Sequence, residues 1–451
     1  LVSFDSSFAP YHPLWNLARP FDVAHNYLWT ATVVPLLLGV LLAAKRMDWL
    51  FANRYRIAVC LLVVAPAFGG INIGRLDITD IVTAFAALFF LMTLLVEDRP
   101  VLIPRIILAL LLGLALFAAA SAVTGGPYVI LTAPAVFLKL MLLFLLANLI
   151  STPHDHQIGL KALVIVAFAS AIMAILGQAV YLTTGYAFTV DDRPEEQFKC
   201  FGWICVLRAT GFTASPQVLG HLLILGLGLT LLMPARARVR LFVLAVLLVG
   251  VVLTFSWGVA VTVAVLLILF PLLRWPSRSL PILITYAGVA WILHVTGAAA
   301  SLYQFADSAL LGSSGVTARI WTYRGGLELI AQHPIFGIGA LGYIPGSLQF
   351  STPHNAYMQI ALELGLPAAT LFVILVLYLL ISCGMTALRI RDTESKRWVG
   401  GLFLGLVGML IHFLSEPLYT NQIPWVYMGL VTSAIVVHKQ SGTERQPMAR
   451  T

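Results

Sequence analysis

Apolar runs of about 20 residues recur from one end of this 451-residue chain to the other. A helix of that length crosses the hydrocarbon core of a bilayer. The composition agrees, because 60% of the residues are hydrophobic and only 10% are charged, against roughly 25% charged in a soluble domain. The alternating pattern of a membrane β-barrel is absent, and a span that is not a closed barrel must be helical. The sequence therefore predicts an all-α, polytopic transmembrane protein with a single membrane domain over residues 1–451.

About 12 or 13 segments are long and apolar enough to be candidate spans. Two neighbouring segments, 239–255 and 258–273, are short enough to be tilted or re-entrant. The predicted spans cover residues 28–44, 57–72, 79–96, 102–124, 128–150, 159–184, 217–233, 239–255, 258–273, 280–299, 356–384, 397–414 and 423–438.

Lysine and arginine are distributed unevenly between the predicted loops. Of the 27 lysines and arginines, 19 fall in one set of alternate loops and Lys139 lies within a span. The other set of loops holds only Arg19, Arg75, Arg193, Lys199, Arg208, Arg319 and Arg324. Because cytoplasmic loops are enriched in positive charge, we expect the first set and the C-terminus to be cytoplasmic. The net charge of +8 follows from these loops and gives no reason to expect nucleic-acid binding.

Two long loops, 185–216 and 300–355, then face outward on the same side of the membrane. Loops of more than about 15 residues are uncommon unless they are functional. The second loop contains apolar residues at helical spacing, which predicts a helix that begins near Ala318 and ends at His333. This large outward loop, including the residues just after it, is where we expect the functional site.

His354 is the first candidate for chemistry, since a histidine titrates near neutral pH and can take a proton from a hydroxyl. It lies between Pro353 and Asn355 at the predicted start of a helix, whose free N–H groups favour anions. The alternative is that His354 only caps this helix. Glu363 follows on the same helix, and a carboxylate there is costly in lipid. It is expected to face the protein interior, where it orients His354 or pairs with an arginine.

Three arginines on the side depleted of positive charge are candidates for holding an anion. A guanidinium presents a planar fork that suits a diphosphate. For Arg208 a salt bridge within its own loop is an equal alternative, with Asp191, Asp192, Glu195 or Glu196 as partner. Arg319 and Arg324 are five residues apart and do not share a helix face. We expect Arg319 to point into the site, and Arg324 to face water or Glu328.

Other polar features carry weaker expectations. Cys200 and Cys205 share one outward loop, and both a disulfide and two free thiols stay open. No metal site is expected. Gly337-Ile338-Gly339 predicts a tight turn that lets the loop pack against the membrane helices. Arg75, Asp77 and Asp80 form a small outward cluster, expected to be structural, and His154, Asp155 and His156 are expected to be solvated on the cytoplasmic side.

Two stretches of the sequence resemble the O-antigen ligase/O-antigen polymerase superfamily. The first is RATGFTASPQVLG, from Arg208 to Gly220, which resembles the family's outward-facing arginine motif. The second runs from RIW at Arg319 through HPIFGIGALGY to PHNAYMQIALELG, which ends at Gly365. One departure stands out, since Ser256-Trp257-Gly258 occupies the place where the family usually has Ser-Arg-Gly. That substitution removes one expected diphosphate contact. Two alternatives stay open: Arg324 or Arg75 replaces it, or the donor binds in a different position.

The resemblance implies a GT-C-like, inverting glycosyltransferase of the bacterial inner membrane that works without a metal or other cofactor. Its donor would be a glycan on undecaprenyl diphosphate, taken at the periplasmic face. Carried over to this sequence, His354 is the catalytic base. The residues that would bind the diphosphate or the glycan are Arg208, Arg319, Arg324, Asn355 and Glu363.

The resemblance leaves the acceptor open. A ligase passes the glycan to the lipid A–core oligosaccharide, and this is our first expectation. A polymerase passes it to another lipid-linked repeat unit by the same chemistry. A transporter of lipid-linked glycans, from another class, would instead place charges in mid-span along a pathway. The polar residues are concentrated in the outward loops, which argues against transport.

Overall fold

The computed structural model describes residues 52–68, 72–73, 76–97, 100–124, 133–185, 198–201, 204–297, 314–339 and 353–443. The chain divides into two compact units, Leu1–Ile57 and Ala58–Thr451. The division falls inside the first described helix, α3 (Arg54–Val64). All that follows concerns the second unit, and the predicted span 28–44 lies outside the described residues.

The described part of the chain is 84% helical and contains 14 α-helices, which confirms the predicted all-α class. The helices after α3 are α4 (Ile78–Glu97), α5 (Arg105–Thr124), α7 (Ala133–Leu149), α8 (Pro153–Thr184), α9 (Pro216–Leu232), α10 (Ala237–Leu253), α11 (Trp257–Arg274), α12 (Ser279–Val295), α14 (Ser314–Gln332), α15 (Ala356–Leu364), α16 (Leu366–Arg389), α17 (Thr393–His412) and α18 (Gln422–Thr443). Three short 3-10 helices join them: η3 (Ala65–Phe68), η5 (Pro276–Arg278) and η6 (Leu418–Thr420).

Five of these helices, α4, α5, α8, α11 and α16, are long and apolar enough to cross a membrane. Three shorter apolar helices, α7, α9 and α12, accompany them. The side chains on the outside of the bundle are strongly apolar, as expected of surfaces that face lipid, with Leu95 78% exposed and Leu116 67% exposed. The protein is a multi-pass membrane protein, as the sequence predicts.

Helix α9 lies at the centre of the bundle, where nearly all of its side chains are buried. Glycines allow α17 to approach it closely. A Cβ atom on Gly401 would lie 2.9 Å from Leu229 Cα, and one on Gly228 would overlap the backbone of Gly405. Small residues at helix crossings are typical of packing inside membranes. This close pairing positions α17 against α9, and the site begins just beyond the end of α17.

The predicted span 356–384 is wrong as a single helix. The structure divides it at Gly365 into α15 and α16, because Gly365 has a φ of 91°, a conformation that ends a right-handed helix. Its Cβ position is also filled by the backbone of Ile335. The two helices have different roles, since α15 follows directly on His354 and Asn355, whereas α16 is a long apolar helix.

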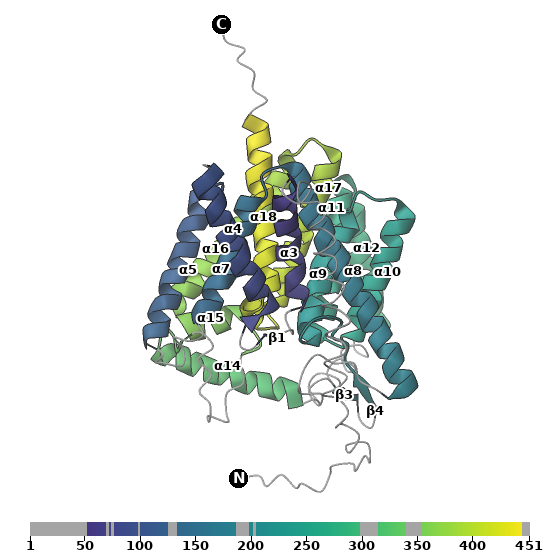
Figure 1. Cartoon of the computed structure of the whole chain (residues 1–451). Helices are drawn as coiled ribbons and strands as arrows, with labels where there is room; N and C mark the ends of the chain where they lie inside the picture. The colour runs from purple at the N-terminus through teal and green to yellow at the C-terminus, as the bar shows by residue number, and fades with distance from the viewer. Residues whose placement is uncertain are drawn as a thin grey trace. The chain divides into compact units, whose positions relative to one another are not determined.

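Helix α14 runs across one end of the bundle, while the C-terminal end of α18 lies at the other end (Figure 1). The sequence predicts this helix but not its start, which lies at Ser314 rather than near Ala318. It packs on α15 through a small apolar cluster in which Ile330 and Leu362 are buried. Gly326 allows α14 and α15 to pack closely, because a Cβ atom at this position would lie only 3.3 Å from the end of the Met358 side chain.

Two short antiparallel hairpins interrupt the helices and are not predicted by the sequence. Strands β1 (Asn72–Ile73) and β2 (Leu76–Asp77) precede α4. Strands β3 (Phe198–Phe201) and β4 (Ile204–Leu207) pair with Cys200 opposite Cys205. The disulfide between Cys200 and Cys205 stays a prediction.

The expectation that His156 is solvated is wrong. Its side chain is 1% exposed, and Nε2 lies 3.1 Å from the carbonyl oxygen of Leu430. The first turns of α8 pack against α18, so the histidine becomes a contact between helices. His154 and Asp155, by contrast, stay at least partly accessible to solvent.

Candidate active site

The candidate active site begins where two connecting segments lie side by side. One segment is Pro353–Asn355, which leads into α15, and the other is the chain that leaves α17 after His412. The amide of Ala356 donates to the carbonyl of Phe413 at 2.9 Å, and Asn355 Nδ2 donates to the carbonyl of Leu414 at 3.3 Å. These bonds bring residues that are about 60 positions apart in the sequence into contact.

Glu416 is at the centre of the site. Its carboxylate is 4% exposed and lies between two partners. Oε2 is 3.4 Å from His354 Nδ1, and Oε1 is 3.4 Å from an Arg319 terminal nitrogen. The two partners are more open, with side chains 34% and 38% exposed. A buried carboxylate thus holds a histidine and an arginine whose other faces are accessible.

Helix α14 contributes Arg319 and also fixes the histidine backbone. Tyr323 Oη donates to the carbonyl of His354 at 2.8 Å, one turn along the helix from Arg319. Burial raises the pKa of the Tyr323 hydroxyl, a rise that Arg319 opposes and Glu416 supports. Tyr323 therefore stays protonated as a donor near neutral pH.

Arg208 reaches the same site from the segment after β4. Its Nε donates to the carbonyl of Thr254 at 3.0 Å, just beyond α10, and the next residue, Ala209, donates its amide to Leu253. Burial lowers the pKa of the Arg208 guanidinium, Glu416 opposes this effect and Arg319 adds to it. Arg208 and Arg319 therefore share one electrostatic environment around Glu416.

The Ser256-Trp257-Gly258 turn lies against this cluster. Gly258 is in close contact with the Ser415 side chain, and a Cβ there would also lie 3.4 Å from the His412 ring. Phe255, just before the turn, has a positive φ of 46°, an uncommon conformation for a bulky residue. The segment that contains the departure from the family motif therefore contacts Ser415, the residue before Glu416, and begins two residues after Thr254, which anchors Arg208.

Two candidates from the sequence are placed differently. Arg324 lies on the exposed face of α14, where its side chain is 75% exposed and pairs with Glu328 at 3.6 Å. The structure does not bring it to Glu416. Asn355 lies beside His354, but its side chain caps α15, since Oδ1 accepts the amide of Met358 at 3.0 Å. The helix cap is therefore Asn355, which leaves the His354 ring available for Glu416.

Glu363 is likewise away from His354, at the other end of α15. Its Oε1 accepts from Gln359 Nε2 at 2.7 Å, and its Oε2 accepts the hydroxyl of Tyr419. The side chain is inward-facing, as the sequence predicts, with 4% of its surface exposed. These two contacts involve neither His354 nor an arginine.

The Gly337-Ile338-Gly339 turn packs onto the end of α15, which confirms its predicted role. Ile338 donates its amide to the carbonyl of Leu362 at 2.9 Å, and Gly339 donates to that of Glu363 at 3.0 Å. Both glycines have positive φ, 65° and 103°. The turn thus satisfies two carbonyls that a helix end leaves without partners.

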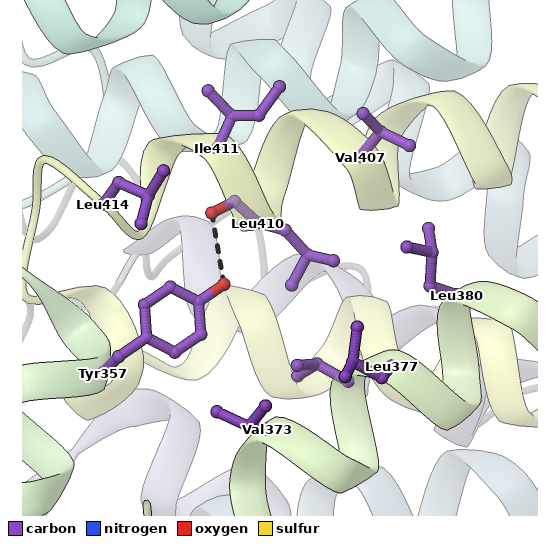
Figure 2. Close-up of a pocket in the computed structure, with 9 residues that line it drawn as sticks. Tyr357, Val373, Leu377, Leu380, Val407, Leu410, Ile411 and Leu414 are labelled. Carbon is purple, nitrogen blue, oxygen red and sulfur yellow. Dashed lines mark hydrogen bonds between the residues drawn. The ribbon is translucent and has the colours of Figure 1, made fainter.

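An apolar groove of about 460 Å³ opens next to the site. Figure 2 shows Tyr357 at one end, with its hydroxyl donating to the carbonyl of Leu410 at 3.2 Å. Tyr357 is three residues from His354, and Leu414 of the same groove is two residues from Glu416. The groove is lined by Tyr357, Val373, Val376, Leu377, Leu380, Val407, Leu410, Ile411 and Leu414.

Sequence reasoning missed Glu416, although a signal was present. The Ser415-Glu416-Pro417 stretch is a short polar break between two apolar spans, on the side that we predict to face outward. Its distance in sequence from His354 hides the contact. No group of three or more histidines, cysteines or carboxylates that could hold a metal occurs among the described residues.

The fold and the site define a multi-pass helical membrane protein with a histidine–carboxylate pair and two arginines at one end of its bundle. Residues 241–373 match the family model described as O-antigen ligase. The match confirms the resemblance to the O-antigen ligase/polymerase superfamily and indicates an enzyme that acts on glycans. It runs from α10 into α16 and includes Arg319, His354 and Glu363. No curated protein matches the chain.

Proposed function

We propose that this chain is an inverting glycosyltransferase that moves a glycan from undecaprenyl diphosphate to the lipid A–core oligosaccharide. The observation that carries the proposal is that Glu416 joins His354 to Arg319, two residues that lie within the segment 241–373 matched by the O-antigen ligase family model. We further propose that the site faces the periplasm across the inner membrane, on the side with few lysines and arginines.

His354 is the proposed base. A carboxylate accepts hydrogen bonds, so Glu416 selects the tautomer with the proton on Nδ1, and Nε2 is left to take the proton of the acceptor hydroxyl. The buried carboxylate then stabilises the imidazolium that forms, as in other acid–base pairs. The separation of 3.4 Å is long for a hydrogen bond, but catalytic contacts often tighten only when substrate binds.

Arg208 and Arg319 are the proposed diphosphate ligands. The acceptor oxygen attacks the anomeric carbon, the bond to the diphosphate breaks, and its electron pair leaves with the phosphate oxygen. Two fixed guanidinium groups stabilise this developing charge without reorganisation. A diphosphate is already a good leaving group, so the site needs no strong general acid, and two arginines supply charge that a metal would otherwise provide.

The apolar groove between α16 and α17 supports a lipid-linked donor. It begins at Tyr357 and Leu414, beside the residues proposed for the chemistry, and it is formed by apolar side chains that suit a hydrocarbon chain. A diphosphate at Arg208 and Arg319 would thus be joined to a tail lying along the bundle. This placement favours transferase over transporter, because the charges gather at one end of the helices.

The test is a transfer assay with purified protein, an undecaprenyl-diphosphate glycan, and either lipid A–core or no second acceptor. We expect product with lipid A–core, and none from His354→Ala. Longer lipid-linked chains without that acceptor would establish the polymerase alternative. Glu328→Gln removes an exposed carboxylate on α14 and serves as the control. No product from the wild type in either mixture would reject the proposed function.

A further inference from the structure

A second buried polar cluster lies at the far end of α15 from His354. Glu363, Gln359 and Tyr419 are 4%, 2% and 2% exposed. The Glu363 carboxylate accepts hydrogen bonds from Gln359 and from the Tyr419 hydroxyl. The proposed chemistry uses none of these three side chains, and a buried carboxylate needs a reason to be retained.

The connection between α17 and α18 contributes to both clusters. It supplies Glu416 to the site and, three residues later, Tyr419 to the second cluster. Pro417 stands between them and restricts the backbone. The 3-10 helix η6 is also held from its other side, because Trp425 Nε1 donates to the carbonyl of Tyr419 at 2.8 Å. The position of Tyr419 therefore constrains the position of Glu416.

Helix α15 and this connection are thus joined at both ends. Near His354 the bonds are from Ala356 to Phe413 and from Asn355 to Leu414. Near Glu363 the bond comes from Tyr419. Two separated attachments fix the orientation of one segment against another, whereas a single attachment leaves it free to rotate.

We propose that Tyr419 is a positioning residue for the transfer reaction. Its hydrogen bond to Glu363 holds η6 in place, and through η6 it holds the Glu416 carboxylate where His354 and Arg319 need it. This inference rests on the proposed function, since it assigns Tyr419 a role in the same site. It also gives Glu363 a role in organising the site rather than in binding glycan.

Charges around Glu363 explain why it can act as a fixed anchor. Lys139, on α7 and 6% exposed, interacts electrostatically with Glu363 and with Asp77 and Asp80 at the start of α4. The Glu363 backbone is fixed as well, because its carbonyl accepts from Ser121 Oγ at 2.6 Å.

The test compares Tyr419→Phe with Tyr427→Phe. Both remove one hydroxyl from a buried tyrosine, but the Tyr427 hydroxyl donates to the carbonyl of Leu402, within α17. We expect Tyr419→Phe to lower kcat about tenfold, because misplacement of a catalytic group by a fraction of an ångström is costly. KM for the donor should rise by a smaller factor than kcat falls, since Arg319 contacts Glu416 but Arg208 is anchored separately on Thr254.

A double-mutant cycle with Glu416→Gln separates positioning from general stability. If Tyr419 acts through Glu416, the double variant should have the same kcat as Glu416→Gln alone. Additive losses, or an equal kcat loss in Tyr427→Phe at matched thermal stability, would overturn the inference. An unchanged kcat in Tyr419→Phe would also overturn the inference. The proposed function is tested separately in the same assay, by transfer with the wild type and its loss in His354→Ala.

Glu363→Gln provides a second variant in case Tyr419→Phe does not fold. Glutamine keeps an oxygen that accepts the Tyr419 hydroxyl, so we expect a smaller loss of kcat than in Tyr419→Phe. If Tyr419→Phe does not fold, Glu363→Gln should retain more kcat than Glu416→Gln. A kcat as low as that of Glu416→Gln would mean that the Glu363 carboxylate acts in its own right, and it would reject the role assigned to Tyr419.

Discussion

At the scale of single residues, the Arg208 guanidinium has two functions: one nitrogen binds the protein backbone, and the others are directed to the proposed site. Its Nε is held by the Thr254 carbonyl, and no further hydrogen bond to it is found in the described parts of the chain, so the terminal amino groups remain for an anion. A lysine has one ammonium group and cannot fill both roles. Arginine at this position should therefore contribute to donor binding through the geometry of its guanidinium as well as through its charge.

We predict that Arg208→Lys raises the Kd for the diphosphate donor. A hydrogen bond to a charged group contributes about 1.5–3 kcal/mol, which corresponds to roughly tenfold to hundredfold weaker binding. The measurement is a titration with the undecaprenyl-diphosphate glycan. Arg324→Lys changes an arginine that is exposed and paired with Glu328, and it should bind the donor normally. Unchanged affinity in Arg208→Lys would count against a phosphate role.

The individual site residues were only partly predictable. His354 and Arg319 come from one polar loop and its end, and the pattern places them together with Arg208 on the outward side. Glu416 was missed because its contact depends on α17 crossing α9 and returning beside α15, which no local pattern encodes. Glu363 was correctly predicted to face inward, but its partners, Gln359 and Tyr419, depend on tertiary packing.

At the scale of elements, the turn at Gly337 has room for a glycine alone. Its φ is 65°, and a Cβ there would lie 2.5 Å from the carbonyl carbon of Glu363 and 2.6 Å from the Leu362 carbonyl oxygen. These neighbours are backbone atoms and cannot move aside cheaply. The turn and the end of α15 therefore support each other.

We predict that Gly337→Ala destabilises the protein by about 2 kcal/mol through backbone strain. The measurement is the thermal midpoint of unfolding in detergent. Gly288→Ala is the matched control, because Gly288 lies within α12 with open space at its Cβ position, and alanine is favoured in helices. A midpoint in Gly337→Ala as high as in the control would show that the turn is not constrained.

The hairpin before α4 carries a carboxyl group with an unusual titration. Burial raises the pKa of Asp77 to about 6 from its ordinary value of 3.8; Asp80 adds to the rise, while hydrogen bonds from Thr79 and the charge of Lys139 oppose it. The folded state thus binds the proton more tightly than the unfolded state. The associated stability is fully present below pH 3.8 and is lost as the pH rises through about 6.

We therefore predict that the thermal midpoint rises when the pH falls from about 7.5 to about 5, and that Asp77→Asn removes part of this rise. Asparagine keeps an oxygen for the Thr79 amide, which Asp77 accepts at 2.8 Å. Asp392→Asn is the control, because hydrogen bonds from Ser395 lower the pKa of Asp392, so its titration falls below this range. An equal pH dependence in wild type and Asp77→Asn would contradict the prediction.

Elements were more predictable than their ends. Long apolar runs predict the membrane helices because lipid imposes both their length and their helical conformation. The break at Gly365 was missed because the apolar pattern continues through it and only the backbone conformation changes. The hairpin of β3 and β4 was missed because its strands are four residues long, which is too short for a clear alternating pattern.

At the scale of the whole bundle, the site and the basic loops lie at opposite ends of α17. This helix starts near Arg397, which donates to the carbonyls of Leu232 and Met233 at the end of α9. It ends at His412, four residues before Glu416. A helix of 20 residues spans about 30 Å, the thickness of a bilayer core. The two ends should therefore face different compartments.

We predict that a cysteine replacing Glu328 on α14 reacts with a membrane-impermeant thiol reagent added from the periplasmic side. A cysteine replacing Glu394, which is exposed at the start of α17, should react only after the inner membrane is opened. The uneven distribution of lysine and arginine gives the direction, because basic loops stay in the cytoplasm. The parent for both variants lacks the four native cysteines and must retain transfer activity. The opposite result, in which Glu394→Cys is labelled from outside and Glu328→Cys is protected, would mean that the topology is inverted. The site would then lie where a periplasmic acceptor cannot reach it.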